Sequence, residues 1–305
     1  MPEDALVALF TELAALPSPP GDERVVADRV TAYLRGLGLD VAEDDAGERI
    51  GSNAGNLYAR LEPSGEGGTP LFFCAHLDTV PPEGAIEPVL DNGVIRNAAG
   101  TILGAPHAHS MEVRFHGRAA HSGMYPEEGR SAIAAAAKAI ADFKLGRVDE
   151  ESTANVGIIG GGTAGNIVPE WCSFLAEARS HDPQKLADLV REMLEAATFA
   201  AGLEDCQVET EVHKSYSGYR FKRDDFVVRL ARTALERTGY EPSLKLSGGA
   251  ADANVFNERG LQCVNLANGM AEIHTPDEHI AVADLEAMVD VTLALVETAR
   301  EAHAA

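Results

Sequence analysis

Between residues 107 and 216 the hydrophobic pattern follows an order of elements that few folds accept. The segment "HSMEVRFHG" alternates as a strand does, and "GRSAIAAAAKAIADF" has the apolar spacing of a helix. Two more strand patterns, "ANVGIIGG" and "VPEWCSFLAEARS", precede a second helix and a last strand, "DCQVETEVHKS". The order β-α-β-β-α-β is that of a ferredoxin-like α+β sandwich. We therefore expect residues 107–216 to form one self-contained domain.

The sequence on both sides of this domain has the pattern of an α/β sheet. Helical periodicity and strand-like runs alternate: helices over 4–16, 22–37, 225–238, 251–258 and 281–303, strands over 55–62, 69–76, 243–247 and 262–267. The run at 69–76, "TPLFFCAH", is apolar almost throughout, which suits a strand covered on both faces. Alternating helices and strands indicate a mostly parallel sheet. The sequence thus predicts an α/β domain of residues 1–105 plus 217–305 that carries 107–216 as an insertion.

Composition narrows the classes of function. The net charge of -23 and the pI of about 4.7 disfavour binding to nucleic acid or to anionic membrane surfaces. No apolar run approaches the roughly 18 residues of a membrane span. The four cysteines lie far apart without a CxxC motif, which is typical of reduced thiols in a cytoplasmic protein. The opening "MPEDALVALF" does not resemble a signal peptide, so we expect a cytoplasmic location.

Two segments outside the insertion carry residues that metal chemistry uses. His76 ends the apolar run at 69–76 and Asp78 lies two residues later, at the end of a predicted strand where open α/β sheets gather their ligand sites. In a His-x-Asp pair the histidine can bind a metal while the aspartate orients its ring. His274 lies in a polar loop, where a solvated histidine is the usual alternative. Each residue alone also fits a structural role.

Further candidates lie in or near the insertion. His121 stands in "AAHSGMYPEEG", and Asn166 and Arg179 lie 13 residues apart across a predicted strand. Asparagine and arginine together can bind a carboxylate, the arginine through two parallel hydrogen bonds. Gly248 and Gly249 permit a tight turn close to a ligand. A turn asparagine and a solvated arginine remain the alternatives for the first pair.

Taken together and in order, these segments resemble one family. The motifs are "HLDTV", "AAHSGMYPEEGRSAI", "GNIVPE", "GGAADANVFNERG" and "GMAEIHTPDEHI". They are similar to the two-zinc metallopeptidases and deacylases that include peptidase T (tripeptide aminopeptidase), glutamate carboxypeptidase, aminoacylase and succinyl-diaminopimelate desuccinylase, with peptidase T-like members closest. The resemblance implies a zinc-peptidase-type α/β sheet domain with an inserted ferredoxin-like dimerisation (lid) domain. It also implies two zinc ions, a small peptide substrate and a homodimer formed through the lid.

The same resemblance implies roles for the candidate residues. His76 would bind one zinc with Asp78 as its orienting neighbour, and His274 would bind the other zinc. His121 would reach into the partner subunit's site and stabilise the oxyanion of the tetrahedral intermediate. The substrate backbone or carboxylate would be held by Asn166 and Arg179, and the turn at Gly248 and Gly249 would lie against the substrate.

One part of the family pattern is missing. In the family, "LGAD" supplies a bridging aspartate, a Glu-Glu pair follows as base and ligand, and a later aspartate completes the second zinc site. Here "TILGA" is followed by Pro106, which has no side-chain oxygen. The missing piece corresponds to about two βα units, roughly 60 residues. Asp252 and Glu272 could replace lost ligands, and His107 and His109 could form an adventitious metal site.

Three interpretations remain open at this point. The first is a peptidase T-like zinc aminopeptidase whose chain carries an internal deletion after Ala105 and is inactive or impaired. The second is a non-catalytic, peptide-binding homodimer. The third is a carboxypeptidase or N-acyl amino acid deacylase with a rebuilt site. If two βα units are missing, the α/β sheet is incomplete and is expected to leave strand edges exposed.

Overall fold

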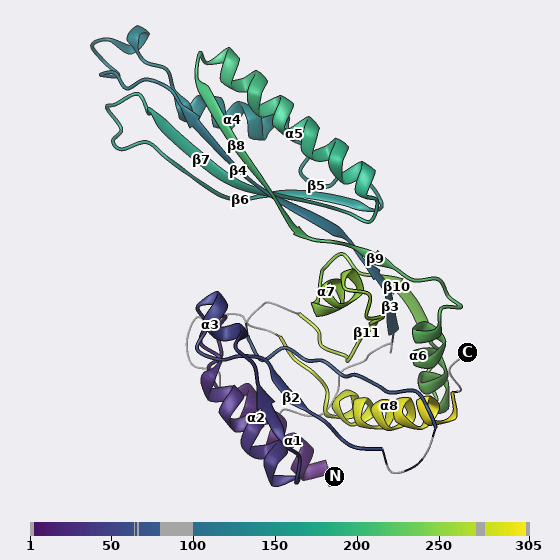
Figure 1. Ribbon diagram of the computed structural model, residues 1–305. Helices are drawn as coiled ribbons and strands as arrows, with labels where there is room; N and C mark the ends of the chain where they lie inside the picture. Colours follow the sequence, from purple (N-terminus) through teal and green to yellow (C-terminus); the bar gives the residue numbers. More distant parts are fainter. Residues whose placement is uncertain (1–2, 64, 66, 80–99, 273–277, 303–305) are drawn as a thin grey trace. The chain divides into compact units, whose positions relative to one another are not determined.

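The structure, a computed structural model, describes residues 3–63, 65, 67–79, 100–272 and 278–302. The chain folds into two compact units (Figure 1). The terminal unit consists of Met1–Thr101, Val228–Ser243 and Leu266–Ala305, and the central unit of Ile102–Val227 and Leu244–Asn265. The domain boundaries expected from the sequence, at 105–107 and 216–217, stay a prediction.

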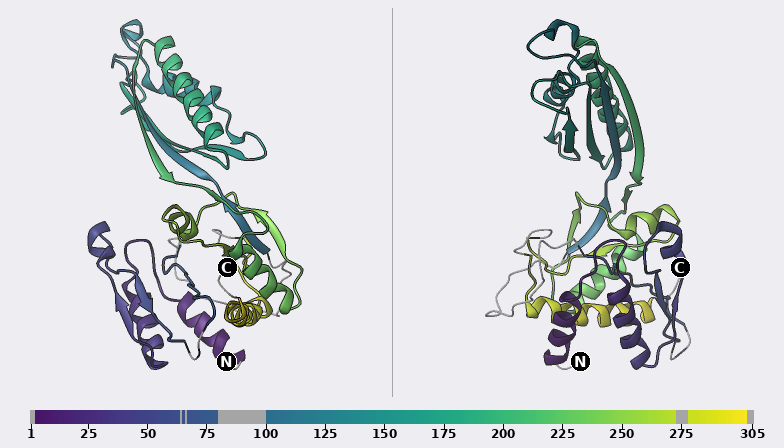
Figure 2. Two further views of the ribbon diagram at one scale, coloured as in Figure 1. Left: turned by 45° about the vertical axis from the view of Figure 1, so that its right-hand side comes forward. Right: turned by 90° about the vertical axis from the view of Figure 1, so that its left-hand side faces the viewer.

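The central unit contains an antiparallel five-stranded sheet in the order β5-β6-β7-β4-β8. Its strands are β4 (His107–His116), β5 (Gly146–Arg147), β6 (Ser152–Gly161), β7 (Trp171–Ser180) and β8 (Gln207–Tyr216). Helices α4 (Ala132–Asp142) and α5 (Pro183–Leu203) lie together on one face of the sheet (Figures 1 and 2), and the single-turn η1 (Pro126–Glu128) precedes α4. The predicted β-α-β-β-α-β order is confirmed, with the two-residue β5 as an addition.

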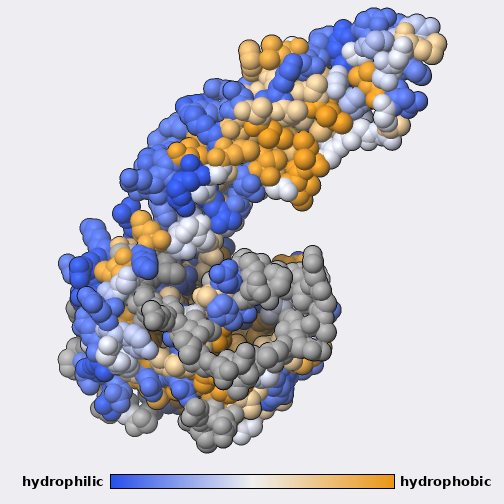
Figure 3. Space-filling model, turned by 180° about the vertical axis from the view of Figure 1, so that it is seen from behind, coloured by the Kyte–Doolittle hydropathy of each residue, from blue (hydrophilic) through white to orange (hydrophobic). Residues whose placement is uncertain are grey.

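Local sequence signals explain why this unit forms. Ser131 caps α4 by accepting a hydrogen bond from the amide of Ala134, and Asp182 caps α5 in the same way. Met111, Val113 and Phe115 alternate along β4 and are buried against the helices. Four alanines of α4 face the sheet, so this helix packs closely upon it. The other face of the sheet carries polar side chains and an apolar region (Figure 3).

A second, smaller sheet has β3 (Gly100–Ala105) between β10 (Ser243–Leu246) and β11 (Asn265–Leu266), and β3 also pairs with β9 (Tyr219–Arg220). Helix α7 (Asp252–Glu258) follows β10. The sequence did not predict β3. After Ala105 the chain continues through Pro106 directly into β4, so the segment expected to approach a metal ligand is instead a strand that leads into the central sheet.

The terminal unit is mostly helical in its described part. Its helices are α1 (Glu3–Ala14), α2 (Arg24–Gly36), α3 (Ala46–Ile50), most of α6 (Phe226–Arg237), and α8 (Val282–Glu301). Strands β1 (Val41–Glu43) and β2 (Leu57–Ala59) form an antiparallel pair. Val228 and Leu235 of α6 and Val291 of α8 are among its buried residues.

The prediction of a buried strand at 69–76 is wrong. Residues 69–79 form no strand, and Leu71, Phe72 and Phe73 are 36%, 47% and 54% exposed. The ends of this segment are fixed: the amide of Thr69 donates to the Ala299 carbonyl of α8, and the amide of Thr79 donates to the Ser18 carbonyl. An apolar run becomes a buried strand only if neighbouring strands and helices cover it. The described residues supply no such cover over 71–76.

Candidate functional site

His76 and Asp78 lie at the end of this exposed apolar segment. The Nδ1 atom of His76 is 2.7 Å from the Asp78 carbonyl oxygen and 3.3 Å from its carboxylate. Because a carbonyl only accepts hydrogen bonds, Nδ1 carries the proton in the neutral ring and Nε2 has the lone pair. This is the tautomer with which a histidine binds a metal through Nε2. Ser18, which is fully buried, steadies the segment by donating to the carbonyl oxygen of Leu77.

The other predicted metal ligand, His274, lies outside the described residues. Its loop is flanked by an isolated antiparallel bridge between Ala271 and His279. Within the described part of the chain, no three or more His, Cys, Asp or Glu side chains come together as a metal site would require. Asp252 and Glu272 belong to no such group among the residues that the structure describes.

His107 and His109 belong to no group of three or more ligands within the described part of the chain either. They occupy the first and third positions of β4. Burial, with help from nearby Lys214, holds the pKa of His107 below its usual range. A half-buried histidine of this kind is neutral at pH 7 and fits a structural role.

His121 and Asn166 lie side by side at one end of the central sheet. An antiparallel bridge joins His121 to Ile167, and the amide of Ser122 donates to the Asn166 carbonyl at 3.1 Å. The Nδ1 atom of His121 accepts from the amides of Gly123 and Met124, both at 3.2 Å. In the neutral ring the proton therefore sits on Nε2. Nε2–H is a hydrogen-bond donor on an exposed side chain, which is what the predicted oxyanion role requires.

Arg179 lies near the opposite end of β7. Its Nε donates to Glu177 at 2.5 Å and its Nη1 donates to the Gly248 carbonyl at 3.1 Å. The Glu177 carboxylate raises the pKa of Arg179. A Cβ atom added at Gly248 would meet no atom within 4 Å, and that at Gly249 only the Ser247 hydroxyl at 3.8 Å. Neither glycine has a positive φ, so packing and backbone conformation do not demand glycine at these two positions.

Asn166 and Arg179, which were expected to hold the substrate together, do not meet within one chain. Trp171 begins β7 just after Asn166, and eight residues of extended strand to Arg179 span about 27 Å. His121 and Asn166 form a distal cluster, and Arg179 and Gly248 form a proximal cluster. A small ligand cannot contact both clusters of the same chain.

The point at which the bridging aspartate was expected is closely packed. Pro106 is fully buried, and its carbonyl accepts from the Asn254 side chain at 3.3 Å. The same amide nitrogen donates to the Ser217 carbonyl at 2.8 Å, and the Asn254 oxygen accepts from the amide of Ala251 at 3.1 Å. A Cβ at Gly218 would lie 2.7 Å from atoms of residues 105 and 107. The junction between β3 and β4 is therefore fixed by a buried asparagine and a required glycine.

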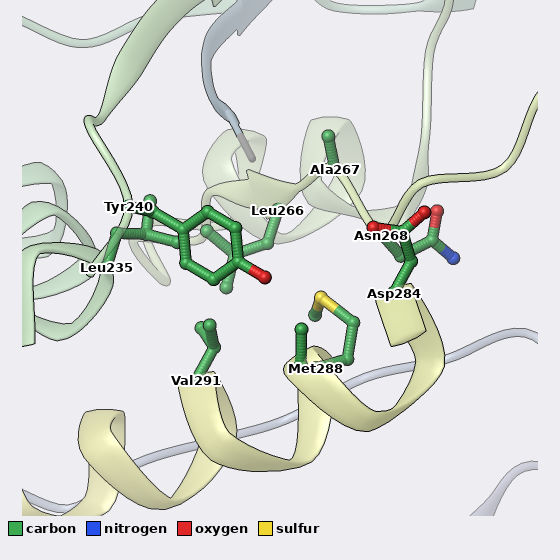
Figure 4. A pocket seen from close by; sticks show the side chains of 9 residues that line it. Leu235, Tyr240, Leu266, Ala267, Asn268, Asp284, Met288 and Val291 are labelled. Atoms are coloured by element: carbon green, nitrogen blue, oxygen red, sulfur yellow. The ribbon is translucent and has the colours of Figure 1, made fainter. Parts of the chain in front are cut away.

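A small pocket in the terminal unit contains none of the predicted site residues (Figure 4). Tyr240 of the loop after α6, together with Asp284 and Met288 of α8, contributes to its lining. One carboxylate oxygen of Asp284 is buried and has no hydrogen-bond partner among the described residues. Gly269, at φ 96°, packs so closely that a Cβ there would lie 2.7 Å from the Asp284 Cβ.

Comparison with known proteins decides the family. Residues 104–202 match the model of a protein family described as "Peptidase dimerisation domain" (M20_dimer). The protein YqjE of Bacillus subtilis, itself uncharacterised, is 30% identical over 97% of this chain and 99% of its own length. The crystal structure of aminopeptidase PepT from Bacillus cereus is similar with a TM-score of 0.84, at 30% identity over 97% of this chain and 98% of that one. The chain belongs to the M20 peptidase family.

Within the M20 family the chain is peptidase T-like, as the motifs predicted. A tripeptidase structure from Staphylococcus aureus is similar at 27% identity, with a TM-score of 0.89 over 98% of this chain and 99% of that one. Succinyl-diaminopimelate desuccinylase from Xylella fastidiosa is 29% identical over a region that covers 57% of this chain and 47% of that enzyme. The predicted fold class, an α/β protein with an inserted dimerisation-type domain, is confirmed.

The comparison with YqjE also reveals a difference in length. It runs over 367 residues, whereas 97% of this 305-residue chain is about 296 residues. Roughly 71 positions of that comparison therefore have no counterpart in this chain.

Sequence reasoning missed two residues that organise these sites. Glu177 lies two residues before Arg179, and the period of two along a strand places both side chains on one face. That spacing was visible in the sequence. Asn254 contacts residues 106 and 217, which are distant in sequence, so no local signal could have found it.

Proposed function

We propose that this chain is a peptidase T-like aminopeptidase by descent that binds small peptides but hydrolyses them poorly or not at all. The observation that carries the proposal is the exposure of the apolar segment that ends at His76. This segment has the composition of a covered strand, yet Phe73 is 54% exposed. The βα units that would cover it in a complete sheet correspond in size to the roughly 71 positions that YqjE has in addition.

The metal chemistry of the family does not fit the described residues. M20 peptidases are generally metal-dependent. A two-zinc centre needs a bridging carboxylate and further acidic ligands, with ions about 3.5–4 Å apart. His76 has the right tautomer, but the described residues gather no set of three ligands around it. We therefore assign no catalytic step to a metal in this chain and expect hydrolysis to be lost or strongly reduced.

Peptide recognition is better supported, because the lid residues are present and oriented. Nε2–H of His121 can donate to a carbonyl oxygen, and Asn166 lies beside it. Arg179 can bind a carboxylate at the proximal cluster. Because about 27 Å of strand separates the clusters, one peptide can be held by both only if they come from different subunits. The proposal thus includes a homodimer through residues of the dimerisation domain.

Location follows from the same proposal. None of the helices in the described part of the chain is long and apolar enough to cross a bilayer. A peptidase T-like protein of this composition is proposed to act in the cytoplasm, on small peptides rather than on nucleic acid or membranes.

A second candidate function is N-acyl amino acid deacylation with a rebuilt site. The similarity to succinyl-diaminopimelate desuccinylase favours it, over 57% of this chain. Trialanine and N-acetylalanine separate the alternatives, because only a peptidase releases a free N-terminal amino acid from the first. We expect the 305-residue chain to bind trialanine without measurable turnover when zinc is supplied. Efficient turnover of trialanine, or turnover of N-acetylalanine alone, would contradict the proposal.

A further inference from the structure

Tyr216 stands in line with Arg179 across the central sheet. Ala108 of β4 is the direct cross-strand partner of Arg179 on β7 and of Tyr216 on β8. Direct partners in neighbouring strands point to the same face, so these three side chains share the face opposite the helices. The pairing of Ala108 with Tyr216 lies just beyond a shift in register between β4 and β8, where Lys214 is the partner of His109. Two strand spacings, about 10 Å, separate Arg179 from Tyr216. Ala108 between them has only a methyl group, which is fully buried.

Tyr216 and Arg179 can each form a further hydrogen bond. The Tyr216 hydroxyl is buried, and no described residue offers it a hydrogen bond. Arg179 uses Nε and Nη1 for Glu177 and Gly248, and neither bond uses Nη2. Buried polar groups are normally hydrogen-bonded, so the unsatisfied Tyr216 hydroxyl, which is within electrostatic reach of the Arg179 guanidinium, indicates a place for an acceptor.

The electrostatics around Tyr216 favour recognition by directed hydrogen bonds rather than by net charge. Burial raises the pKa of Tyr216, and Glu177 raises it further while Arg179 opposes this. The phenol is therefore neutral near pH 7 and can donate. Glu177 offsets the charge of Arg179, so attraction by net charge is weak at this point. Recognition then depends on the number and direction of the hydrogen bonds.

The turn after β10 contacts Arg179 and is open at Gly248. Nη1 of Arg179 holds the carbonyl of Gly248, and a Cβ at this residue would meet no atom within 4 Å. A ligand can therefore approach the backbone of the turn closely. Arg179, Tyr216 and the turn all belong to the central unit.

We propose that Tyr216 is a specificity-determining residue, whose hydroxyl and the Nη2 of Arg179 together bind the carboxylate of a small peptide or acylated amino acid. This inference rests on the proposed function for the substrate class. The bond arrangement explains why a tyrosine stands at this position in β8, where a phenylalanine would fill the same volume. It also predicts discrimination between a free carboxylate and its amide.

The test is calorimetric titration of the full chain with trialanine, trialanine amide and N-acetylalanine. Tyr216→Phe removes the hydroxyl and keeps the ring. Tyr219→Phe is the matched control, because Tyr219 also has a buried hydroxyl without a described partner and shows no electrostatic interaction with Arg179. Removing an unsatisfied hydroxyl does not endanger folding. A hydrogen bond to a charged group is worth about a tenfold change in affinity or more.

We expect the wild-type chain to bind the two acids at least tenfold more tightly than the amide. Tyr216→Phe should lose about tenfold for the acids and nothing for the amide, and Tyr219→Phe should behave as wild type. Equal loss in both variants, or none in Tyr216→Phe, would overturn the inference. So would a wild-type chain that binds none of the acids.

The outcomes also separate this inference from the proposed function. If carboxylate preference depends on Tyr216 but N-acetylalanine is the preferred ligand or substrate, the inference stands and the peptidase assignment fails. If trialanine binds without any dependence on Tyr216, the peptidase assignment stands and the inference fails.

Discussion

Replacement of Asn254 by alanine should loosen the junction between β3 and β4. The side chain of Asn254 is 2% exposed and makes three hydrogen bonds, to the carbonyls of Pro106 and Ser217 and from the amide of Ala251. The two carbonyls belong to chain segments 148 and 37 residues away in the sequence. The substitution therefore removes a tertiary link and leaves buried acceptors unsatisfied.

The magnitude follows from the bonds lost. A typical buried hydrogen bond contributes about 1 kcal/mol net, and an acceptor left unsatisfied adds to the cost, so Asn254→Ala should cost about 3 kcal/mol. The central unit has about 150 residues, for which 1 kcal/mol corresponds to roughly 2–4 °C in Tm. We expect its Tm to fall by roughly 6–12 °C.

The assay is urea unfolding together with amide hydrogen exchange, and Asn257→Ala is the control. Asn257 also makes three hydrogen bonds from α7, but to Ala253 and Cys263, and it is only partly buried. Asn257→Ala should lower the free energy of unfolding by less than Asn254→Ala does, and it should leave amide hydrogen exchange around Ser217 unchanged. A loss below about 1 kcal/mol for Asn254→Ala, or one no larger than for Asn257→Ala, would refute the assignment of Asn254 as the link.

Three further predictions concern other parts of the chain. Gly218→Ala should destabilise the central unit by more than about 2 kcal/mol in urea unfolding, because its Cβ would lie 2.7 Å from backbone atoms, whereas Gly165→Ala, in open space, should be near neutral. Burial lowers the pKa of His107 and of His181, so the unfolded state takes up protons at a higher pH than the folded state does. The contribution of these histidines to the free energy of unfolding should be fully present above about pH 6.5 and should decline as the pH falls toward the lowered folded-state pKa values. A urea midpoint that does not change with pH between about 5 and 7 would contradict this. Phe73→Ser should lower binding of a hydrophobic dye and self-association without lowering Tm, because this ring is 54% exposed; a clear fall in Tm would mean that the ring is packed.

The elements of the central unit could be predicted because their signals are local. Alternating apolar residues mark each long strand, and Ser131 and Asp182 mark the first turns of the two helices. β3 could not be predicted in this way. It is a strand because Gly104 and Ala105 pair with β9, and that pairing depends on residues more than 110 positions away.

The prediction of a buried strand at 69–76 was wrong for the complementary reason. Its composition is that of a covered strand, but composition specifies only what a segment needs and cannot show whether partners exist. The same holds for the site. The family motifs singled out His121 and Asn166 separately, but their position beside each other became visible only in the folded chain. The distance from Asn166 to Arg179 follows from strand length alone. The hydrogen bonds of Arg179 to Glu177 and Gly248 became visible only in the folded chain.

The central claim is that this M20 chain keeps a peptide-binding lid and lacks the segment that completes its metal centre. The most direct test is an insertion between Ala105 and Pro106. The inserted segment is the stretch of B. subtilis YqjE that has no counterpart in this chain. An inserted Gly/Ser stretch of equal length serves as the control. Zinc per chain and trialanine hydrolysis are then measured together. We predict that the natural chain and the Gly/Ser control show no turnover, whereas the chain with the YqjE segment gains both zinc binding and hydrolysis. Two zinc ions and full turnover in the natural 305-residue chain would contradict the account.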